Sequence, residues 1–465
     1  MKKEHTTLNP SERYFPNHKL KRDIGLAEYE LAASRLSAEQ AALNWAKSAI
    51  VAISSIIIFI SFKAAEYSDG LKDIGLTETQ IKIGSLAIAV TIGILAVVHI
   101  ANLLKSKHLA ERKIIVLRRM MGVRYGENTL VLPNWRLEGA DSPFSIHLFP
   151  GYFSPRSFPL HLIMVAISTA AMLLGNSVFQ YMPSCIRRMF QEEIYFSAAL
   201  AVILCLVLSG VFKYNLREMH ENFILSFSKI VAKVLRVRLV PNFENAIYHI
   251  KLDIEEAKRI RADFTWVTRW ALEIEDHSFY RHRGISVRGI ARAILGKMRK
   301  RNLGGGSTIT QQFARGNFIE SRSNLYRRKI VEILLAFWVE SVFEKPDIMK
   351  GYLVTARFDS EVYGFHRAAA HFLSVDPREI DEALGFFLIE RLGNVRSYFL
   401  GRRIAQLLRS AVWMEGKGLS TLSDILKMYQ KCLDDGKIFE KDNDISISKV
   451  RSQFDCLDIT SAESR

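Results

Sequence analysis

The sequence predicts a mainly α-helical protein in which four membrane-spanning helices precede a mostly helical soluble domain. Four apolar stretches of about 20 residues, the length that a bilayer-spanning helix requires, lie in the first half of the chain. Hydrophobic residues make up 49% of the 465 residues, which excludes a largely disordered protein. After residue 240 few runs alternate as strands do, so helices are expected there as well.

The four apolar stretches are almost free of charge. Only Lys47, near one end, is fully charged, and its long side chain can reach the membrane surface. A soluble core helix rarely stays apolar on every face over this length, so four spans are favoured over a buried helical hairpin. The stretches are Leu43–Phe62, Ile83–Leu104, Leu160–Phe179 and Ile194–Phe212.

Charge and turn residues divide the chain into five expected parts. No apolar run precedes the late forties, so no ordinary cleaved signal peptide is expected. From Asn215 to Val240 apolar residues recur at helical spacing among Lys and Arg, which is typical of a helix on a membrane surface and equally of a helix that packs on a domain. The parts are a basic N-terminal tail (1–42), a four-span region (43–212) with a soluble loop (105–157), an amphipathic connector (213–260), a soluble domain (261–410) and a C-terminal tail (411–465).

The charge balance favours an anionic partner. With 64 Lys and Arg against 48 Asp and Glu, the net charge of +16 suits a lipid surface, a phosphate-bearing substrate or nucleic acid. Lys and Arg gather before Trp45, between Lys105 and Arg156, and after Phe212. The positive-inside rule therefore predicts that both termini and the soluble domain lie on the cytoplasmic side.

Two segments of the soluble domain carry side chains that can do chemistry. Residues 275–284 place two adjacent acids, Glu275 and Asp276, a few residues before His282 and end in Gly284. Taken alone, such acids often cap a helix or form surface ion pairs. Residues 304–312 follow about thirty residues later, with three glycines that let the backbone approach a ligand and then Ser, Thr and Gln side chains.

A third segment combines two cations with an acid. Helical spacing puts Arg328 and Lys329 on the same face as Glu332, where they form either a self-contained ion pair or part of a binding site. The histidines show no HExxH or similar spacing, so a histidine-bound structural metal is not expected. The four cysteines lie far apart without a CxxC and are expected to be free thiols.

In this order, the three segments resemble the motifs of the peptidoglycan glycosyltransferase family (glycosyltransferase family 51), the transglycosylase module of bifunctional penicillin-binding proteins and of monofunctional cell-wall transglycosylases. The second motif, GGSTITQQ, is matched in full by residues 305–312, and the similarity extends over about 261–402. The first motif, EDxxFxxHxG, and the third, RKxxE, are matched by Glu275, Asp276, Phe279, His282, Gly284, Arg328, Lys329 and Glu332.

The sequence departs from the family pattern in two places. Val354 stands where the family usually has Asn, and the segment 355–362 that follows it is atypical. Arg315-Gly316-Asn317 replaces a Lys-Asn pair with one extra residue. No transpeptidase domain is recognisable after the matched region, so the resemblance is to the monofunctional type.

The resemblance implies a lysozyme-like, mostly helical glycosyltransferase domain that polymerises lipid II-type polyprenyl-pyrophosphate disaccharides into β-1,4 glycan with inversion. It implies Glu275 as general base and Glu332 as a second catalytic acid that orients cations or a divalent metal such as Mg or Mn. The residues that it implies in substrate binding are Asp276, Phe279, His282, Gly305, Gly306, Ser307, Thr308, Thr310, Gln311, Gln312, Arg315, Arg328, Lys329 and Lys345.

Two other functions and the membrane side stay open at this point. A non-catalytic membrane scaffold would retain the lipid-pyrophosphate cleft, although it would not need Glu275. A membrane-tethered nucleic-acid binder would explain the charge but not the GGGSTITQQ segment, so no nucleic acid is expected. The resemblance implies a bacterial cytoplasmic membrane with the domain on its outer face, which disagrees with the Lys and Arg distribution. The extra spans suggest a partner in cell-wall synthesis.

Overall fold

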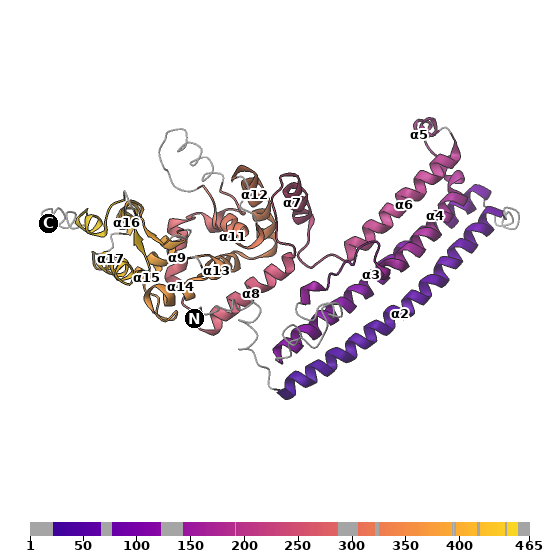
Figure 1. Ribbon diagram of the computed structural model, residues 1–465. Coiled ribbons are helices and arrows are strands. Elements are labelled where there is room, and N and C mark those ends of the chain that lie inside the picture. The colour runs from indigo at the N-terminus through magenta and orange to yellow at the C-terminus, as the bar shows by residue number, and fades with distance from the viewer. Residues whose placement is uncertain are drawn as a thin grey trace, which may run out of the picture. The chain divides into compact units, whose positions relative to one another are not determined.

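The computed structural model is helical almost throughout and divides into two compact units, Met1–Met219 and His220–Arg465, here called the N-terminal unit and the C-terminal unit (Figure 1). Four of its helices are long and apolar enough to cross a membrane. The predicted mainly α fold, with four such helices before a helical domain, is therefore confirmed. The structure describes residues 22–66, 77–121, 143–190, 192–286, 306–320, 325–359, 361–392, 394, 397–415, 419–441 and 444–453.

In the N-terminal unit, α4 lies at the centre of the helix packing. It contacts the three other long helices, α2, α3 and α6, and its residues from Leu160 to Leu174 include several that are completely buried. Small residues allow this close approach: a Cβ on Gly175 would come within 2.6 Å of the Ser197 hydroxyl. The helices are α2 (Arg22–Glu66), α3 (Glu78–Met120), α4 (Phe158–Phe179), α5 (Ser184–Met189) and α6 (Glu193–Asn215), with 3-10 turns η3 (Pro143–Ser145) and η4 (Pro155–Ser157).

Helices α2 and α3 are longer than their apolar stretches predict. At 45 and 43 residues each is about 65 Å long, roughly twice the hydrocarbon thickness of a bilayer. Beyond the apolar stretches the two helices pack on each other through Ala32, Ile114 and Leu117, and Lys113 pairs with Glu28 at 3.3 Å. This second contact accounts for helix within the segments predicted as an N-terminal tail and as the 105–157 loop.

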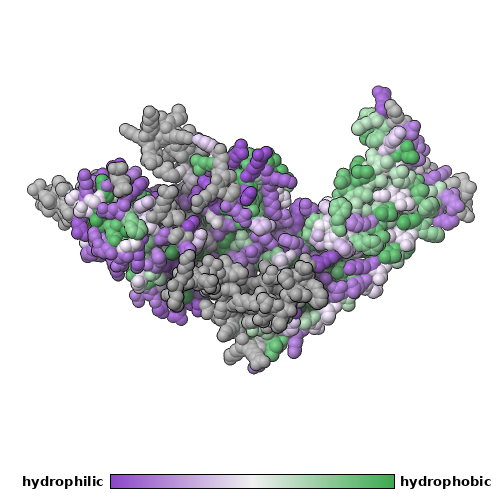
Figure 2. All heavy atoms as spheres, viewed as in Figure 1, coloured by the Kyte–Doolittle hydropathy of each residue, from purple (hydrophilic) through white to green (hydrophobic). Residues whose placement is uncertain are grey.

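The surface of the N-terminal unit is rich in hydrophobic residues. In Figure 2 green, hydrophobic residues cover much of α4 and α6, whereas hydrophilic residues cover most of the visible C-terminal unit. Exposed residues of α6 include Ile194, Val202 and Leu206. Apolar side chains on the outside of an apolar helix are typical of a lipid-facing surface.

The C-terminal unit is a helical domain with one short parallel pairing of two strands. The segment predicted as a C-terminal tail contains α17, whose Tyr429 and Cys432 are completely buried in the core. Its elements are α7 (Phe223–Val234), α8 (Phe243–Arg259), α9 (Thr265–Ile274), η5 (Phe279–Arg281), α11 (Ile309–Phe318), α12 (Leu325–Val342), α13 (Lys345–Thr355), α14 (Phe365–Leu373), α15 (Glu382–Arg391), β1 (Tyr398–Phe399), α16 (Gly401–Glu415), α17 (Leu419–Asp434) and β2 (Phe439–Glu440).

Local sequence explains where several of these helices begin. Asn222, Asn242, Thr308 and Asp381 each accept a hydrogen bond from a backbone N–H in the first turn of the helix that follows. The predicted amphipathic helix over 215–240 is replaced by the end of α6 and the shorter α7, because the Asn222 cap starts a new helix. The five predicted part boundaries stay predictions.

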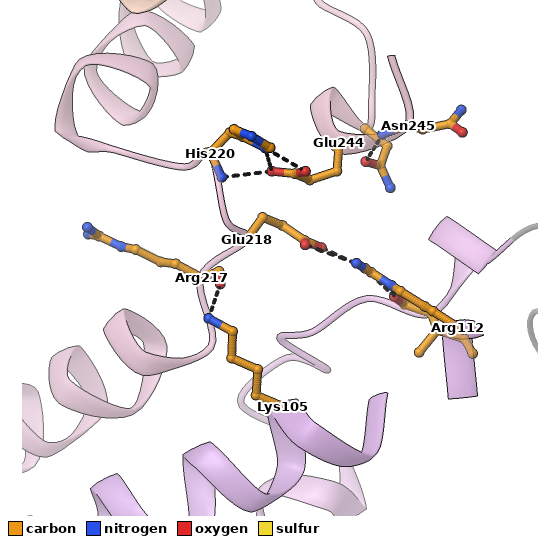
Figure 3. Close-up of polar contacts among 9 residues, drawn as sticks. Lys105, Arg112, Arg217, Glu218, His220, Glu244 and Asn245 are labelled. Carbon is orange, nitrogen blue, oxygen red and sulfur yellow. Dashed lines mark hydrogen bonds and ion pairs between the residues drawn. The ribbon is translucent and has the colours of Figure 1, made fainter. Parts of the chain in front are cut away.

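The chain passes from one unit to the other between Met219 and His220, and polar contacts within each unit hold the residues on its own side of this boundary (Figure 3). In the N-terminal unit, Arg112 donates hydrogen bonds of 2.7 and 3.0 Å to Glu218, and Lys105 donates to the carbonyl oxygen of Arg217. In the C-terminal unit, the backbone N–H and the ring Nδ1 of His220 both contact the Glu244 carboxylate. Polar contacts therefore hold the chain on both sides of the Met219–His220 boundary.

Candidate active site

Glu275 lies at the C-terminal end of α9 and is bound by α11. The Nε2 of Gln312 donates a hydrogen bond of 2.6 Å to Glu275 Oε2. The hydroxyl of Tyr352, on α13, donates in turn to Gln312 Oε1 at 3.1 Å. Burial first, and then the charge of Glu275, raise the pKa of Tyr352 well above its usual value, so this hydroxyl stays a donor. The amide of Gln312 is thereby fixed with its NH₂ group toward Glu275.

Asp276 has a different environment from its neighbour. It is buried and accepts a hydrogen bond from the backbone N–H of Ile309, the first residue of α11, and its Oδ2 lies 2.8 Å from His282 Nε2. Among the described contacts neither acid pairs with an arginine of its own segment, whereas the bond from Ile309 N–H is of the helix-capping kind that the alternative interpretation also allowed for Asp276. Asp276 therefore joins the first motif to the N-terminal end of α11.

Gly284 closes the first motif in a conformation that suits glycine. Its φ is +84°, and a Cβ there would lie 3.0 Å from the carbonyl oxygen of Ala336. The hydroxyl of Thr308 donates to the carbonyl oxygen of Gly284 at 2.6 Å and also caps α11. The first and second motifs are therefore held together at the start of α11.

Glu332 is the second carboxylate, and two cations bind it. Arg328 Nε donates to its Oε1 at 3.0 Å, and Lys329 Nζ contacts its Oε2 at 3.3 Å. Lys329 Nζ also donates to Ser307 Oγ at 2.6 Å and to Gln311 Oε1 at 2.7 Å. Since Gln311 and Gln312 are consecutive residues of α11, the groups around Glu275 and those around Glu332 attach to the same turn of one helix.

Three cations lie close together on the Glu332 side. Burial lowers the pKa of Lys329 despite the favourable charge of Glu332, and the nearby charges of Arg315 and Arg328 lower that pKa further. Among the described residues, Glu332 is the carboxylate that pairs with these cations, and Glu320 is a second acid in the wall of the cleft that Arg315 and Arg328 line. The excess positive charge suits the oxygens of a phosphate group.

A cleft of about 490 Å³ lies beside these groups, although Glu275, Lys329 and Glu332 are not themselves among the residues that line it. Gln312, which binds Glu275, and Arg328, which binds Glu332, both line its wall. The segments that depart from the family pattern also meet there, since Asn317 and Thr355 line the cleft and are joined by a hydrogen bond of 3.0 Å. The full lining is Gln312, Phe313, Arg315, Gly316, Asn317, Ile319, Glu320, Arg328, Tyr352, Thr355, Ala356, Arg357, Tyr363 and Leu392.

The remaining predicted site residues support these elements. The ammonium of Lys345 lies 4.3 Å from the centre of the buried Phe279 ring and donates to Glu340 at 2.7 Å. Thr310 donates to the same Glu340 oxygen. Gly306 is half-buried next to Ser307, and Gly305 lies outside the described residues.

Sequence reasoning did not select Arg403, Glu340 or Glu390 as site residues. Arg403, on α16, lies 3.9 Å from Glu275 Oε1. No local spacing indicates such contacts, because they join helices that are far apart in the sequence. Tyr352 was not selected either, although Lys345, Ile348, Tyr352 and Leu353 resemble a further stretch of the family, KxxILexYLN, and this was the available signal.

The described residues do not offer a metal site. In the described part of the chain, no three His, Cys, Asp or Glu side chains come together in a group that could hold a metal ion. Both oxygens of Glu332, the carboxylate that pairs with the cationic group in the described structure, are taken by Arg328 and Lys329. A divalent cation prefers several oxygen ligands, so this donor set does not fit one. The divalent cation stays an expectation from the resemblance.

Comparisons with known proteins agree with the site. The family model described as Transglycosylase matches residues 255–413. The chain is 30% identical over 135 residues to a monofunctional glycosyltransferase of Staphylococcus saprophyticus, an alignment that covers 27% of this chain and 50% of the relative. It is 38% identical over 120 residues to penicillin-binding protein 1A of Neisseria cinerea, covering 25% of this chain and 15% of the relative.

The matched region contains every described residue of the three motifs. The chain spans half the length or less of these relatives, and its N-terminal unit lies outside the matched region. Glu275, Gln312, Arg328 and Glu332 all lie inside it. On this agreement of motif order, site geometry and family match, residues 255–413 form a domain of the transglycosylase family.

Proposed function

We propose that the protein is a membrane-bound glycosyltransferase of the monofunctional transglycosylase type, which polymerises polyprenyl-pyrophosphate disaccharides such as lipid II into β-1,4 glycan with inversion. The observation that carries the proposal is that one lightly bound carboxylate and one cationic group are held by consecutive residues of the same turn of α11, Gln312 and Gln311, beside one cleft. Such a pair suits a reaction that needs a base at one end and loses a diphosphate at the other.

Glu275 is the proposed general base. A sugar hydroxyl is a poor nucleophile, so its proton must be removed as its oxygen attacks C1 of the donor sugar. Glu275 keeps one oxygen free of any hydrogen bond in the described contacts, and Gln312 holds the other. The attack forms the new C1–O bond on the face opposite the leaving group, which accounts for inversion.

Arg315, Arg328 and Lys329 are the proposed partners of the leaving pyrophosphate. As the bond from C1 to the pyrophosphate oxygen breaks, negative charge develops on that oxygen, and fixed cations stabilise it without a proton donor. Glu332 fixes the direction of Arg328 and Lys329 by binding both. Asp276 and His282 shape the start of α11 and take no proton in this scheme.

The apolar face of α7 supports a position at the membrane surface, where a lipid-linked substrate is found. Four of its residues, at helical spacing, are exposed: Phe223, Phe227, Ile230 and Val234. The opposite face packs on α12. An amphipathic helix with Lys on its flanks can lie in the membrane interface with this face toward the acyl chains.

The test is polymerisation by the purified full-length protein. With lipid II as substrate, we expect a glycan ladder on a gel and release of polyprenyl pyrophosphate. Glu275→Gln should make no glycan. Glu255→Gln is its matched control, because in the described structure Glu255 forms an exposed ion pair with Lys258 and lies outside the site. Binding of lipid II without any product would instead support the non-catalytic scaffold.

The side of the membrane decides which lipid-linked sugar reaches the domain. Polymerised glycan requires the outer face, whereas a domain on the cytoplasmic face acts on lipid-linked sugars before they cross. The native Cys432 is a poor probe, because burial raises the pKa of its thiol to about 11. In a variant without other cysteines, labelling of Lys251→Cys on α8 and of the exposed native Cys185 on α5 by an impermeant reagent locates the C-terminal unit and the segment between α4 and α6. If α6 spans the membrane, only one of the two is labelled in intact cells.

A further inference from the structure

Glu390 is a buried acid that the proposed mechanism does not use. It lies on α15, is completely buried, and its Oε2 accepts a hydrogen bond of 2.7 Å from the Tyr429 hydroxyl. Its Oε1 has no hydrogen-bond partner in the described structure. Burial raises the pKa of Glu390, while the charge of Arg391 and the Tyr429 hydrogen bond oppose that shift. A buried carboxylate with an open oxygen is costly, so its presence calls for a partner.

That partner is Arg403 on α16. Its Nε lies 3.8 Å from the open Oε1 of Glu390, and one of its terminal nitrogens lies 3.9 Å from Glu275 Oε1. Both distances suit an ion pair but are too long for a hydrogen bond. The guanidinium therefore faces two carboxylates at once and is bound tightly by neither.

The support for Glu390 comes from outside the family match. The match ends at residue 413, and Tyr429 lies on α17, beyond that limit. Helix α17 packs directly on α15, and Tyr429 is completely buried there. A line of contacts thus runs from α17 through Glu390 and Arg403 to the proposed base.

We propose that Glu390 and Tyr429 are positioning residues for the glycosyl transfer proposed above: they hold Arg403 between two carboxylates, so that Glu275 shares this cation and remains an effective base. If Arg403 belonged to Glu275 alone, its charge would stabilise the ionised carboxylate and weaken it as a proton acceptor. Glu390 draws part of that charge away. The inference rests on the proposed function, because it assigns Glu275 a proton to accept.

Other charged and titratable groups face the same carboxylates. Glu390 is also near Arg391 of its own helix and Tyr429 of α17, and Glu275 is near Tyr352 of α13. Arg315 of α11 acts on Tyr352 as well. The variants below leave these four groups in place, except where Tyr429 itself is changed.

The experiment is the pH dependence of polymerisation by the full-length protein and its variants. On the acid side the rate reports protonation of the base. We expect Glu390→Gln to move this limb toward lower pH by about half a unit, since an opposite charge close to a carboxylate lowers its pKa. Tyr429→Phe should move it less in the same direction, because loss of this hydrogen bond raises the pKa of the buried Glu390, and the neutral acid no longer attracts Arg403. Arg403→Gln should move it toward higher pH.

Two controls separate this role from a structural one and from failure of the proposed function. Glu379→Gln, an exposed acid before α15, should leave the acid limb in place. A wild-type protein that makes no glycan refutes the proposed function itself. The positioning role alone is refuted by a different result. In that case the wild-type protein polymerises, and Glu390→Gln and Arg403→Gln change the melting temperature or the rate, but the acid limbs of both variants coincide with the acid limb of the wild type. If Glu390→Gln does not fold, Arg403→Gln decides, because that side chain is 40% exposed.

Discussion

Glu275 and Glu332 are each bound by a residue of the cleft wall, Gln312 and Arg328, but the two acids differ in what else surrounds them. The side chain of Glu332 is 2% exposed and contacts two cations, whereas that of Glu275 is 18% exposed and receives one hydrogen bond from a neutral amide. A carboxylate that two cations neutralise is a weak proton acceptor, while one held by an amide retains a usable lone pair. The surroundings, and not the residue type, are therefore the basis of the two proposed roles.

The largest expected effect tests the Glu275 side. Glu275→Gln should lower the polymerisation rate by about 10²- to 10⁴-fold, the usual contribution of a general base. The melting temperature should stay within error of the wild type, because the Gln side-chain oxygen can still accept the hydrogen bond from Gln312. Gel assays of glycan and a thermal melt check both parts. A variant that keeps more than a tenth of the wild-type rate would contradict the base assignment.

The next effect tests the Glu332 side. Glu332→Gln should lower both the rate and the stability, since it leaves Arg328 and Lys329 without their carboxylate. Hydrogen bonds to charged groups contribute about 1.5–3 kcal/mol each, so a loss of roughly 2 kcal/mol in the free energy of unfolding is expected. Denaturant titration of this variant beside Glu255→Gln measures it. Equal stability of the two variants would mean that the ion pairs do not hold the cleft together.

The pH dependence of the rate tests the proposed role of Lys329 in the cationic group. Burial lowers the pKa of Lys329, so this side chain loses its charge at a lower pH than a free lysine does. Polymerisation should therefore decline on the alkaline side as Lys329 deprotonates. Lys329→Arg stays charged and should move that decline to higher pH. Superimposable alkaline limbs for wild type and variant would remove Lys329 from the leaving-group role.

A smaller effect is expected at the support of the base. Tyr352→Phe removes the hydrogen bond that orients Gln312. The loss of one neutral hydrogen bond, about 1 kcal/mol, corresponds to roughly a fivefold lower kcat. KM for lipid II and the cationic contacts should change little. An unchanged kcat would show that Gln312 holds its orientation without Tyr352.

The sequence predicted the features that follow from local geometry. Helical spacing alone places Arg328 on the same face as Glu332, and the observed ion pair has that i,i+4 form. The apolar stretches likewise predicted the four long helices. Their ends could not be predicted, because α2 and α3 continue into mixed-charge segments that become helical by packing on each other.

Contacts between distant helices could not be predicted in the same way. Arg403 follows another arginine in an ordinary helical segment, and nothing in its spacing indicates Glu275 or Glu390. Tyr429 lies in a segment without a recognisable motif, where its burial depends on how α17 packs on α15. Such positions are decided by tertiary packing, which a periodic pattern does not encode.

In the proposed function, Glu275 removes a proton and the cationic group binds a diphosphate. Equilibrium binding of a polyprenyl pyrophosphate to the purified wild-type, Glu275→Gln and Arg328→Gln proteins separates these two roles. We expect Glu275→Gln to bind as the wild type does and Arg328→Gln to bind at least about tenfold more weakly, a loss of about 1.4 kcal/mol. Equal weakening in both variants would contradict the division of roles between the two sides.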